Sequence, residues 1–141
     1  MRPRNGERGS TLAETALVMG VLLLLTLGIM DFARALYTYS FVANAARQGA
    51  RWAIVRGSQC TQLDHCNAKS SDVQTYVQSL SEGAMKASNI TANLGFPACS
   101  GSNAPGCVAE VTVQYPFTFV APFVSKLTLT MSSTSEMLIS N

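Results

Sequence analysis

Hydrophobic residues form one block near the start of the chain, and no charged residue interrupts positions 15–30. A helix needs about 20 apolar residues to cross a bilayer, and residues 10–30 reach that length if Glu14 is tolerated. Three arginines, Arg2, Arg4 and Arg8, precede the block and favour a cytoplasmic N-terminus. The pattern therefore predicts one membrane-spanning helix, with the rest of the chain outside the cytoplasm.

The basic start and the apolar block admit three interpretations. A secretory signal peptide would end near Ala35, a signal anchor would stay uncleaved, and cleavage after Gly9 would leave the apolar helix on the mature protein. Glu14 favours the third, because a carboxylate at the edge of a membrane helix is costly and usually functional. With Ser10 as the new N-terminus, Glu14 can pair with its α-ammonium group. The simpler alternative places Glu14 among headgroups without a role.

The helical pattern continues past the apolar block as an amphipathic extension over residues 31–56, with Gly57 as the expected stop. One face is expected to carry Phe32, Ala35, Leu36, Tyr39, Val42, Ala43, Ala46, Ala50, Ala53 and Ile54, and the opposite face Ser40, Asn44, Arg47, Gln48 and Arg51. Together the two parts predict a rod of about 70 Å. This continuity argues against cleavage near Ala35, which would cut the rod.

Small residues on the rod point to close helix packing. We expect the alanine-rich extension to pack against the chain's own domain and the membrane part against neighbouring rods. Ala16 and Gly20 form a small-xxx-small pair, with Gly28 further along, although such pairs often arise by chance. Asp31 and Arg34 are three residues apart, and we expect them to form a solvated surface pair at the membrane boundary.

Residues 57–141 predict a small α+β domain. Helical spacing predicts a second helix from Ser70 to about residue 87, and a short strand is expected over residues 89–94. Alternation predicts a strand over residues 109–115, another over residues 127–131 and a last one over residues 135–139. An aromatic connection between Pro116 and Pro122 separates the first two of these. Its phenylalanines, Phe117, Phe119 and Phe123, are expected to fill the core and a corner.

The four cysteines, Cys60, Cys66, Cys99 and Cys107, fit an oxidising compartment. Of the three possible connectivities we favour Cys60–Cys66 with Cys99–Cys107, because each pair brackets a polar loop. The rival is a zinc site made of Cys60, His65, Cys66 and one later cysteine. Its spacing is not a recognisable zinc pattern, and exported thiolates would be oxidised first. We therefore expect two disulfides and no metal, with His65 exposed in a loop.

Composition excludes several function classes. The net charge is +2 and no Lys/Arg cluster is present, so a nucleic-acid partner is not expected. The chain has a single His and no phosphate-binding or dinucleotide motif. A hydrolytic triad or metalloprotease would therefore lack its base. We expect no catalytic residues, no cofactor, no small-molecule substrate and no enzymatic activity.

The run Gly9-Ser10-Thr11-Leu12-Ala13-Glu14, with its basic leader and apolar helix, resembles the cleavage site of type IV prepilins and pseudopilins. The longer stretch over residues 9–57 closely resembles the TadE-like pseudopilins of the Flp/Tad pilus system, above all in DFARALY at 31–37 and NAARQGAR at 44–51. One departure is Thr15, since the major Flp pilins have Tyr after the Glu. This difference indicates a minor component.

The resemblance implies a structural minor pilin in Flp/Tad pilus assembly, adhesion and surface attachment. Its leader, residues 1–9, would be removed by a prepilin peptidase. Residues 10–30 would lie in the inner membrane among its lipids, and residues 57–141 would form a pilin-like periplasmic domain. Further partners would be other pilins and the pilus assembly platform, and the subunit would reach the cell surface in the pilus. The alternatives are an uncleaved single-pass envelope protein with a partner-binding outer domain, and a secreted disulfide-stapled enzyme or binding domain.

Overall fold

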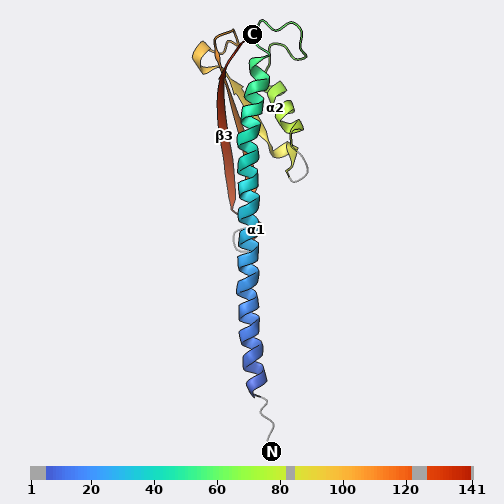
Figure 1. The fold of residues 1–141 in the computed structure, drawn as a ribbon, viewed down its shortest axis with the longest axis vertical. Helices are drawn as coiled ribbons and strands as arrows, with labels where there is room; N and C mark the ends of the chain where they lie inside the picture. Colours follow the sequence, from blue (N-terminus) through green and yellow to red (C-terminus); the bar gives the residue numbers. More distant parts are fainter. Residues whose placement is uncertain (1–5, 82–84, 122–126, 141) are drawn as a thin grey trace, which may run out of the picture.

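One long helix with a small domain packed on its far end makes up the computed structural model (Figure 1). The structure describes residues 6–81, 85–121 and 127–140, with side chains from residue 9 onward. The start of the expected leader, residues 1–5, and two members of the aromatic connection, Pro122 and Phe123, lie outside these ranges. Helix α1, Gly6–Ile54, is unbroken over 49 residues, which confirms the predicted rod.

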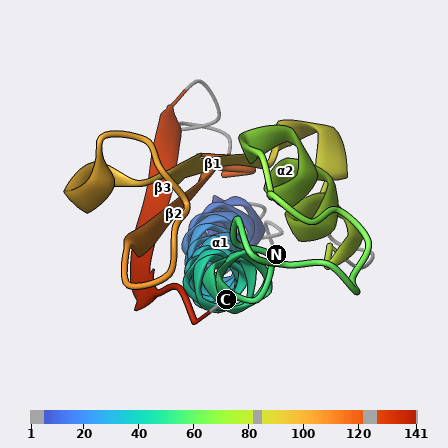
Figure 2. The ribbon, with the colours of Figure 1, turned by 90° about the horizontal axis from the view of Figure 1, so that it is seen from above.

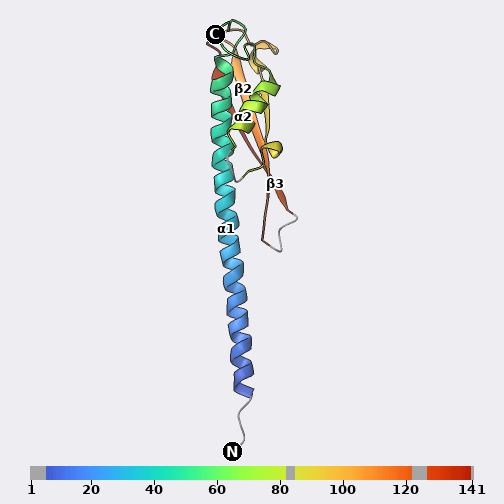
Figure 3. The same cartoon turned by 90° about the vertical axis from the view of Figure 1, so that its right-hand side faces the viewer.

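The two halves of α1 have different surroundings. Every residue from 9 to 30 is exposed except the half-buried Leu27. We call residues 9–30 the free segment. Buried positions begin at Asp31 and recur at helical spacing as far as Ala53. The domain therefore covers only the second half of the helix, and Figure 3 shows the first half extending away from it.

The domain is a three-stranded antiparallel sheet and a short helix arranged around α1. Strands β1 (Thr91–Gly95), β2 (Val108–Thr118) and β3 (Thr128–Leu138) follow the order β1-β2-β3. Helix α1 packs against β2 and β3, whereas α2 (Ser70–Ser79) covers β1 (Figure 2). Two short 3-10 turns, Ala87–Asn89 and Pro97–Cys99, flank β1. This arrangement confirms the predicted α+β class.

The main core joins small residues of α1 to branched residues of the domain. Its buried members are Val42, Ala45, Ala46, Ala50, Ala53, Val73, Val77, Ile90, Ala92, Val111 and Val113. Gly49 lies where α1, α2 and β2 meet. A Cβ placed there would lie 3.1 Å from Val111 Cγ1 and 3.3 Å from Val77 Cγ2. The helix can therefore approach both partners closely only because position 49 has no side chain.

We expect Gly49→Leu to lower the free energy of unfolding by about 1–3 kcal/mol, because the added side chain overpacks a closed space. This loss outweighs the gain in helix propensity of about 1 kcal/mol on replacing glycine. Denaturant unfolding of the full chain in detergent, followed by Trp52 fluorescence, measures the change. The neighbouring exposed Gln48→Leu is the control and should stay within about 0.5 kcal/mol. Equal midpoints for the two variants would contradict the packing described.

Side chains of α2 satisfy backbone groups on the outer edge of β1. Gln74 Nε2 donates to the Ile90 carbonyl at 2.9 Å, and Gln74 Oε1 accepts the Ala92 N–H at 2.7 Å. Ser70 Oγ accepts the Leu94 N–H at 3.1 Å. An unpaired strand edge is a template for unwanted pairing. Helix α2 therefore closes this edge of the sheet.

The disulfides join Cys60 to Cys66 and Cys99 to Cys107, which is the local pairing. Since all four cysteines are bonded, the zinc set built on Cys60, His65 and Cys66 does not form. Cys107 packs in a second small core with Ala109 and Ile139, and its carbonyl accepts the Ile139 N–H at 2.8 Å. The second disulfide therefore lies beside the point where the end of the chain returns to the sheet.

Three predictions of secondary structure were wrong in their bounds. Helix α2 ends at Ser79 rather than near residue 87, since Ser79, Ser81 and Gly83 are weak helix formers. The two strands expected over residues 127–131 and 135–139 are the single strand β3. Pro116 and Phe117 lie inside β2 rather than in a connection. There β1 no longer pairs with β2, so the missing N–H of proline costs no ladder bond.

The predicted buried face of α1 was right from Val42 onward and wrong before it. Phe32, Leu36 and Tyr39 are exposed, whereas Asp31 and Thr38 are buried. The expected polar face, Ser40, Asn44, Arg47, Gln48 and Arg51, is exposed as predicted. The domain therefore contacts a stripe of α1 rotated from the most apolar one. A helical pattern shows which residues are apolar but not which of them the sheet will cover.

Candidate functional site

The free segment carries more than half of the exposed large hydrophobic side chains in the described part of the chain. The structure contains one helix long and apolar enough to cross a membrane, with a mean hydropathy of 2.3 in its most apolar window, of which 6% is buried. Two of the hydroxyl groups in the free segment, those of Thr15 and Thr26, are satisfied within the helix. Thr15 Oγ1 donates to the Thr11 carbonyl at 2.7 Å, and Thr26 Oγ1 donates to the Leu23 carbonyl at 2.9 Å. Hydroxyls bonded in this way do not oppose burial in lipid.

The three residues of the expected processing site lie together at the start of α1. Gly9, Ser10 and Glu14 are all exposed and helical. Ser10 and Glu14 are four residues apart, so they share one face a single turn apart. In a chain that began at Ser10, the new α-ammonium group would lie within a turn of the Glu14 carboxylate. Apart from its chain neighbours and the backbone of its own helix, no described atom lies within 4 Å of the position that a Cβ on Gly9 would occupy.

The three residues of the expected packing site are also uncovered. Ala16, Gly20 and Gly28 are exposed, and a Cβ on either glycine would meet nothing within 4 Å. Ala16 and Gly20 lie one turn apart on the same face of the helix. Within the part of the chain that the structure describes, no packing contact requires these positions to be small.

Asp31, directly after the free segment, is the main departure from the sequence analysis. It is 4% exposed rather than part of a solvated pair. Its carboxylate accepts the Val120 N–H at 2.9 Å and the Ala121 N–H at 2.7 Å, besides its contact with Arg34 at 3.0 Å. Since Val120 and Ala121 lie two and three residues after the end of β2 at Thr118, Asp31 ties the far end of the β2–β3 hairpin to α1.

These bonds set the protonation of Asp31. The N–H of Ala121, aided by that of Val120 and by the Arg34 guanidinium, holds the pKa of Asp31 below its ordinary value of 3.8, although burial acts in the opposite direction. Because the folded-state pKa is lowered, the stabilisation is fully present above pH 3.8 and is lost as the pH falls through the lower folded-state value. Asp31 therefore stays charged at neutral pH.

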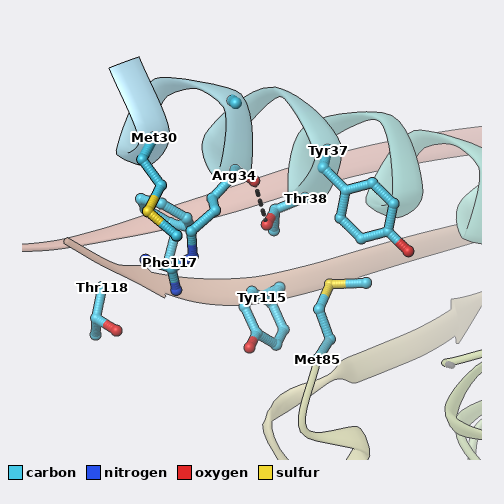
Figure 4. A pocket seen from close by; sticks show the side chains of 9 residues that line it. Met30, Arg34, Tyr37, Thr38, Met85, Tyr115, Phe117 and Thr118 are labelled. Atoms are coloured by element: carbon cyan, nitrogen blue, oxygen red, sulfur yellow. Dashed lines mark hydrogen bonds between the residues drawn. The ribbon is translucent and has the colours of Figure 1, made fainter. Parts of the chain in front are cut away.

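An open cavity of about 400 Å³ lies between α1 and the hairpin, next to this contact (Figure 4). Its lining is mostly apolar and comprises Met30, Ala33, Arg34, Tyr37, Thr38, Met85, Tyr115, Phe117 and Thr118. The Arg34 guanidinium lies 5.5 Å from the centre of the Phe117 ring, and Thr38 Oγ1 donates to the Arg34 carbonyl. Among the described residues, the lining offers one guanidinium, two phenols and two threonine hydroxyls, and no carboxylate, thiol or imidazole.

The opposite end of the domain holds His65 in an exposed loop, as predicted. Its Nδ1 lies 3.5 Å from Asp72 Oδ1, and its ring is near Trp52, which stacks on Tyr76 at 5.4 Å. The Arg56 guanidinium lies over the Trp52 ring, 4.1 Å from the ring centre. Among the described residues, no group of three or more His, Cys, Asp or Glu side chains could hold a metal ion. These contacts serve to fix the Cys60–Cys66 loop.

Residues 9–51 match the family model described as TadE-like protein. This segment is TadE-like. The match confirms the resemblance seen in the sequence, and it covers the free segment together with most of the buried stripe of α1. No curated protein and no solved structure matches the chain. The similarity to this family is therefore confined to residues 9–51, and the sheet, α2 and both disulfides lie outside the match.

The roles predicted for the processing and packing residues stay predictions, whereas the sequence analysis missed the buried contacts of Asp31. A signal for it was present: Asp31, Thr38 and Val42 are separated by seven and four residues, so they share one helix face. An acidic residue on the stripe that continues into the core indicates a buried carboxylate with partners. Those partners, at positions 120 and 121, are too distant in sequence for any local pattern to reveal.

Proposed function

We propose that this protein is a structural minor pilin of an Flp/Tad-type pilus. The observation that carries the proposal is the free segment: an apolar helix surface, uncovered by the chain's own domain, inside a stretch that matches the TadE-like family. Such a surface is stable in lipid or among other apolar helices, and unstable in water. A subunit of this kind resides in the inner membrane and joins pilus assembly through that helix.

The proposal assigns each part of the chain a place. Residues 1–9 are the leader, removed by a prepilin peptidase after Gly9, and residues 10–30 span the inner membrane with the N-terminus cytoplasmic. The disulfides fit a periplasmic domain over residues 57–141. The partners are the peptidase, other pilins and the assembly platform. The role is structural rather than enzymatic and contributes to adhesion and surface attachment.

Lateral packing of the free segment is the proposed assembly step. Helices in lipid associate through close van der Waals contact, which small residues such as Ala16, Gly20 and Gly28 permit. Glu14 sets the axial register, because its carboxylate attracts the α-ammonium group of an adjacent subunit's Ser10. Pairing the two charges offsets the cost of holding each of them in an apolar surrounding.

The N-terminus of the membrane-extracted protein tests this function. Intact-mass measurement together with N-terminal sequencing is expected to give a chain that begins at Ser10. A strain without prepilin peptidase activity is the control and should give the uncut chain. A native chain that begins at Met1 would indicate the uncleaved envelope protein, and one that begins at Leu36 would indicate the secreted domain. Either result would contradict the proposal.

A further inference from the structure

The end of the β2–β3 hairpin carries apolar side chains that the domain does not cover. Val120 and Leu127 are each 59% exposed, and Leu129 is 50% exposed. We call these three residues the hairpin end. They lie at the end of the sheet farthest from the disulfide-bonded loops (Figures 1 and 3). The surface is therefore apolar where the domain reaches farthest along α1 toward the free segment.

The alternation of β3 shows that this surface continues the core outward. Leu127, Leu129 and Met131 are two residues apart, so they share one face of the strand. Met131 is buried in the domain, whereas the two leucines beyond it are not. The apolar alternation of residues 127–131 therefore continues beyond Met131, the point up to which the domain covers these side chains.

Asp31 fixes the level of the hairpin end along α1. Its carboxylate binds the N–H groups of Val120 and Ala121, and it directly follows Met30, the last residue of the free segment. The exposed apolar residues of the helix at this level are Ile29, Met30 and Phe32. The hairpin end and the top of the free segment therefore both present exposed apolar side chains near the level of Asp31, from two elements far apart in sequence.

We propose that the hairpin end is a second membrane contact, which dips into the lipid interface beside the transmembrane helix. The proposal rests on the proposed membrane span of residues 10–30. A group held at position 31 then lies where the acyl chains meet the headgroups, a layer that accepts apolar side chains to a depth of about 5–10 Å. The partly exposed Arg34 guanidinium lies at the same level, where lipid phosphates attract cations.

We favour lipid over a second copy of the chain as the partner of the hairpin end, because Asp31 holds the hairpin end next to the proposed membrane span. A partner protein would have to reach a surface that adjoins the exposed helix at its entry into the bilayer. Lipid already surrounds the helix there in the single subunit. The contact would fix the tilt of the domain on the membrane, since a rod with one point of insertion can rotate and lean, whereas two points restrain both motions.

Tryptophan depth-quenching in vesicles tests the proposal with the full chain. In a Trp52→Phe background, single tryptophans are placed at Leu129 and, separately, at Val120. The vesicles are phosphatidylcholine, either unlabelled, brominated near the top of the acyl chains for positions 129, 120 and 138, or brominated near the chain ends for position 22. The matched control is Leu138→Trp, because residue 138 is 64% exposed on the same strand at its other end. Leu22→Trp, in the middle of the free segment, reports on the membrane span itself.

Bromination is expected to quench Leu129→Trp and Val120→Trp roughly twofold, as for an interfacial side chain, and to leave Leu138→Trp unchanged. Quenching of Leu22→Trp without quenching at positions 129 and 120 would overturn the proposal while leaving the membrane span intact. A blue-shifted emission at position 129 that bromination does not quench would indicate a protein partner, and would also overturn it. No quenching at position 22 would instead contradict the proposed function.

Asp31→Asn tests whether the hairpin end reaches the membrane because Asp31 holds it at this level, or only because its side chains are apolar. The amide keeps the size of the side chain but loses the charge, and its nitrogen is a donor that faces either the two backbone N–H groups or the Arg34 guanidinium, depending on its orientation. Quenching of Leu129→Trp is expected to fall toward the level of the Leu138→Trp control, while quenching of Leu22→Trp stays unchanged. Undiminished quenching at position 129 would show that Asp31 does not position this contact.

Discussion

Gly9→Leu is expected to abolish removal of residues 1–9, so that the uncut chain accumulates in the membrane. Position 9 meets nothing within 4 Å in the structure, so a leucine there disturbs no contact of the chain's own. An effect on processing must therefore arise in the peptidase, whose access to the bond after Gly9 the side chain would obstruct. Intact-mass measurement of the membrane fraction distinguishes the uncut from the cut chain.

Gly20→Leu is the matched control for that experiment. It makes the same change in the same helix at a position that is equally uncovered, but eleven residues away from the expected cleavage site. We expect normal processing of this variant, whatever its effect on helix packing. A chain of mature mass from Gly9→Leu would contradict the cleavage assignment, and a block in both variants would show that the effect is not specific to the site.

Glu14→Gln is the second large effect that we expect, and it concerns assembly rather than processing. The variant should enter the membrane and be cut normally, because an amide is less costly in lipid than a carboxylate. Its incorporation into pili should fall at least roughly tenfold, since a charge-assisted hydrogen bond contributes about 1.5–3 kcal/mol and 1.4 kcal/mol is a factor of ten. Quantitative immunoblotting of sheared pili against the membrane fraction measures this ratio.

Glu136→Gln provides the comparison, because Glu136 is an exposed carboxylate on β3, away from α1's first turns. We expect its incorporation to equal that of the unaltered chain. If Glu14→Gln were incorporated equally well, the pairing between Glu14 and a neighbouring amino terminus would be wrong, even if cleavage after Gly9 were correct.

The parts of the fold that the sequence predicted are those with local causes. Helix α1 follows from a periodic pattern, and the two disulfides follow from cysteines that bracket short polar loops. The strand around Val111 and Val113 follows from strict alternation. In each case the residues that decide the structure lie within a few positions of one another.

The parts that the sequence did not predict depend on distant contacts. The partners of Asp31 lie 89 and 90 residues away, so spacing alone made it look like one member of an (i, i+3) surface pair. Phe32 and Leu36 are apolar on a helix wheel, but only the path of the sheet decides that they stay exposed. For the processing and packing residues, the structure adds position and exposure, and their roles stay predictions.

The order in which the elements leave the ribosome gives the alanine stripe of α1 a second significance. Its partners β2 and β3 begin at Val108 and Thr128, so Ala46, Ala50 and Ala53 lack the cover of the sheet until these strands have been synthesised. Uncovered apolar surface in an incomplete chain invites misassembly. Methyl side chains expose far less such surface than leucines would. A helix whose partner strands are synthesised later is therefore less prone to misassembly when its uncovered face consists of small residues.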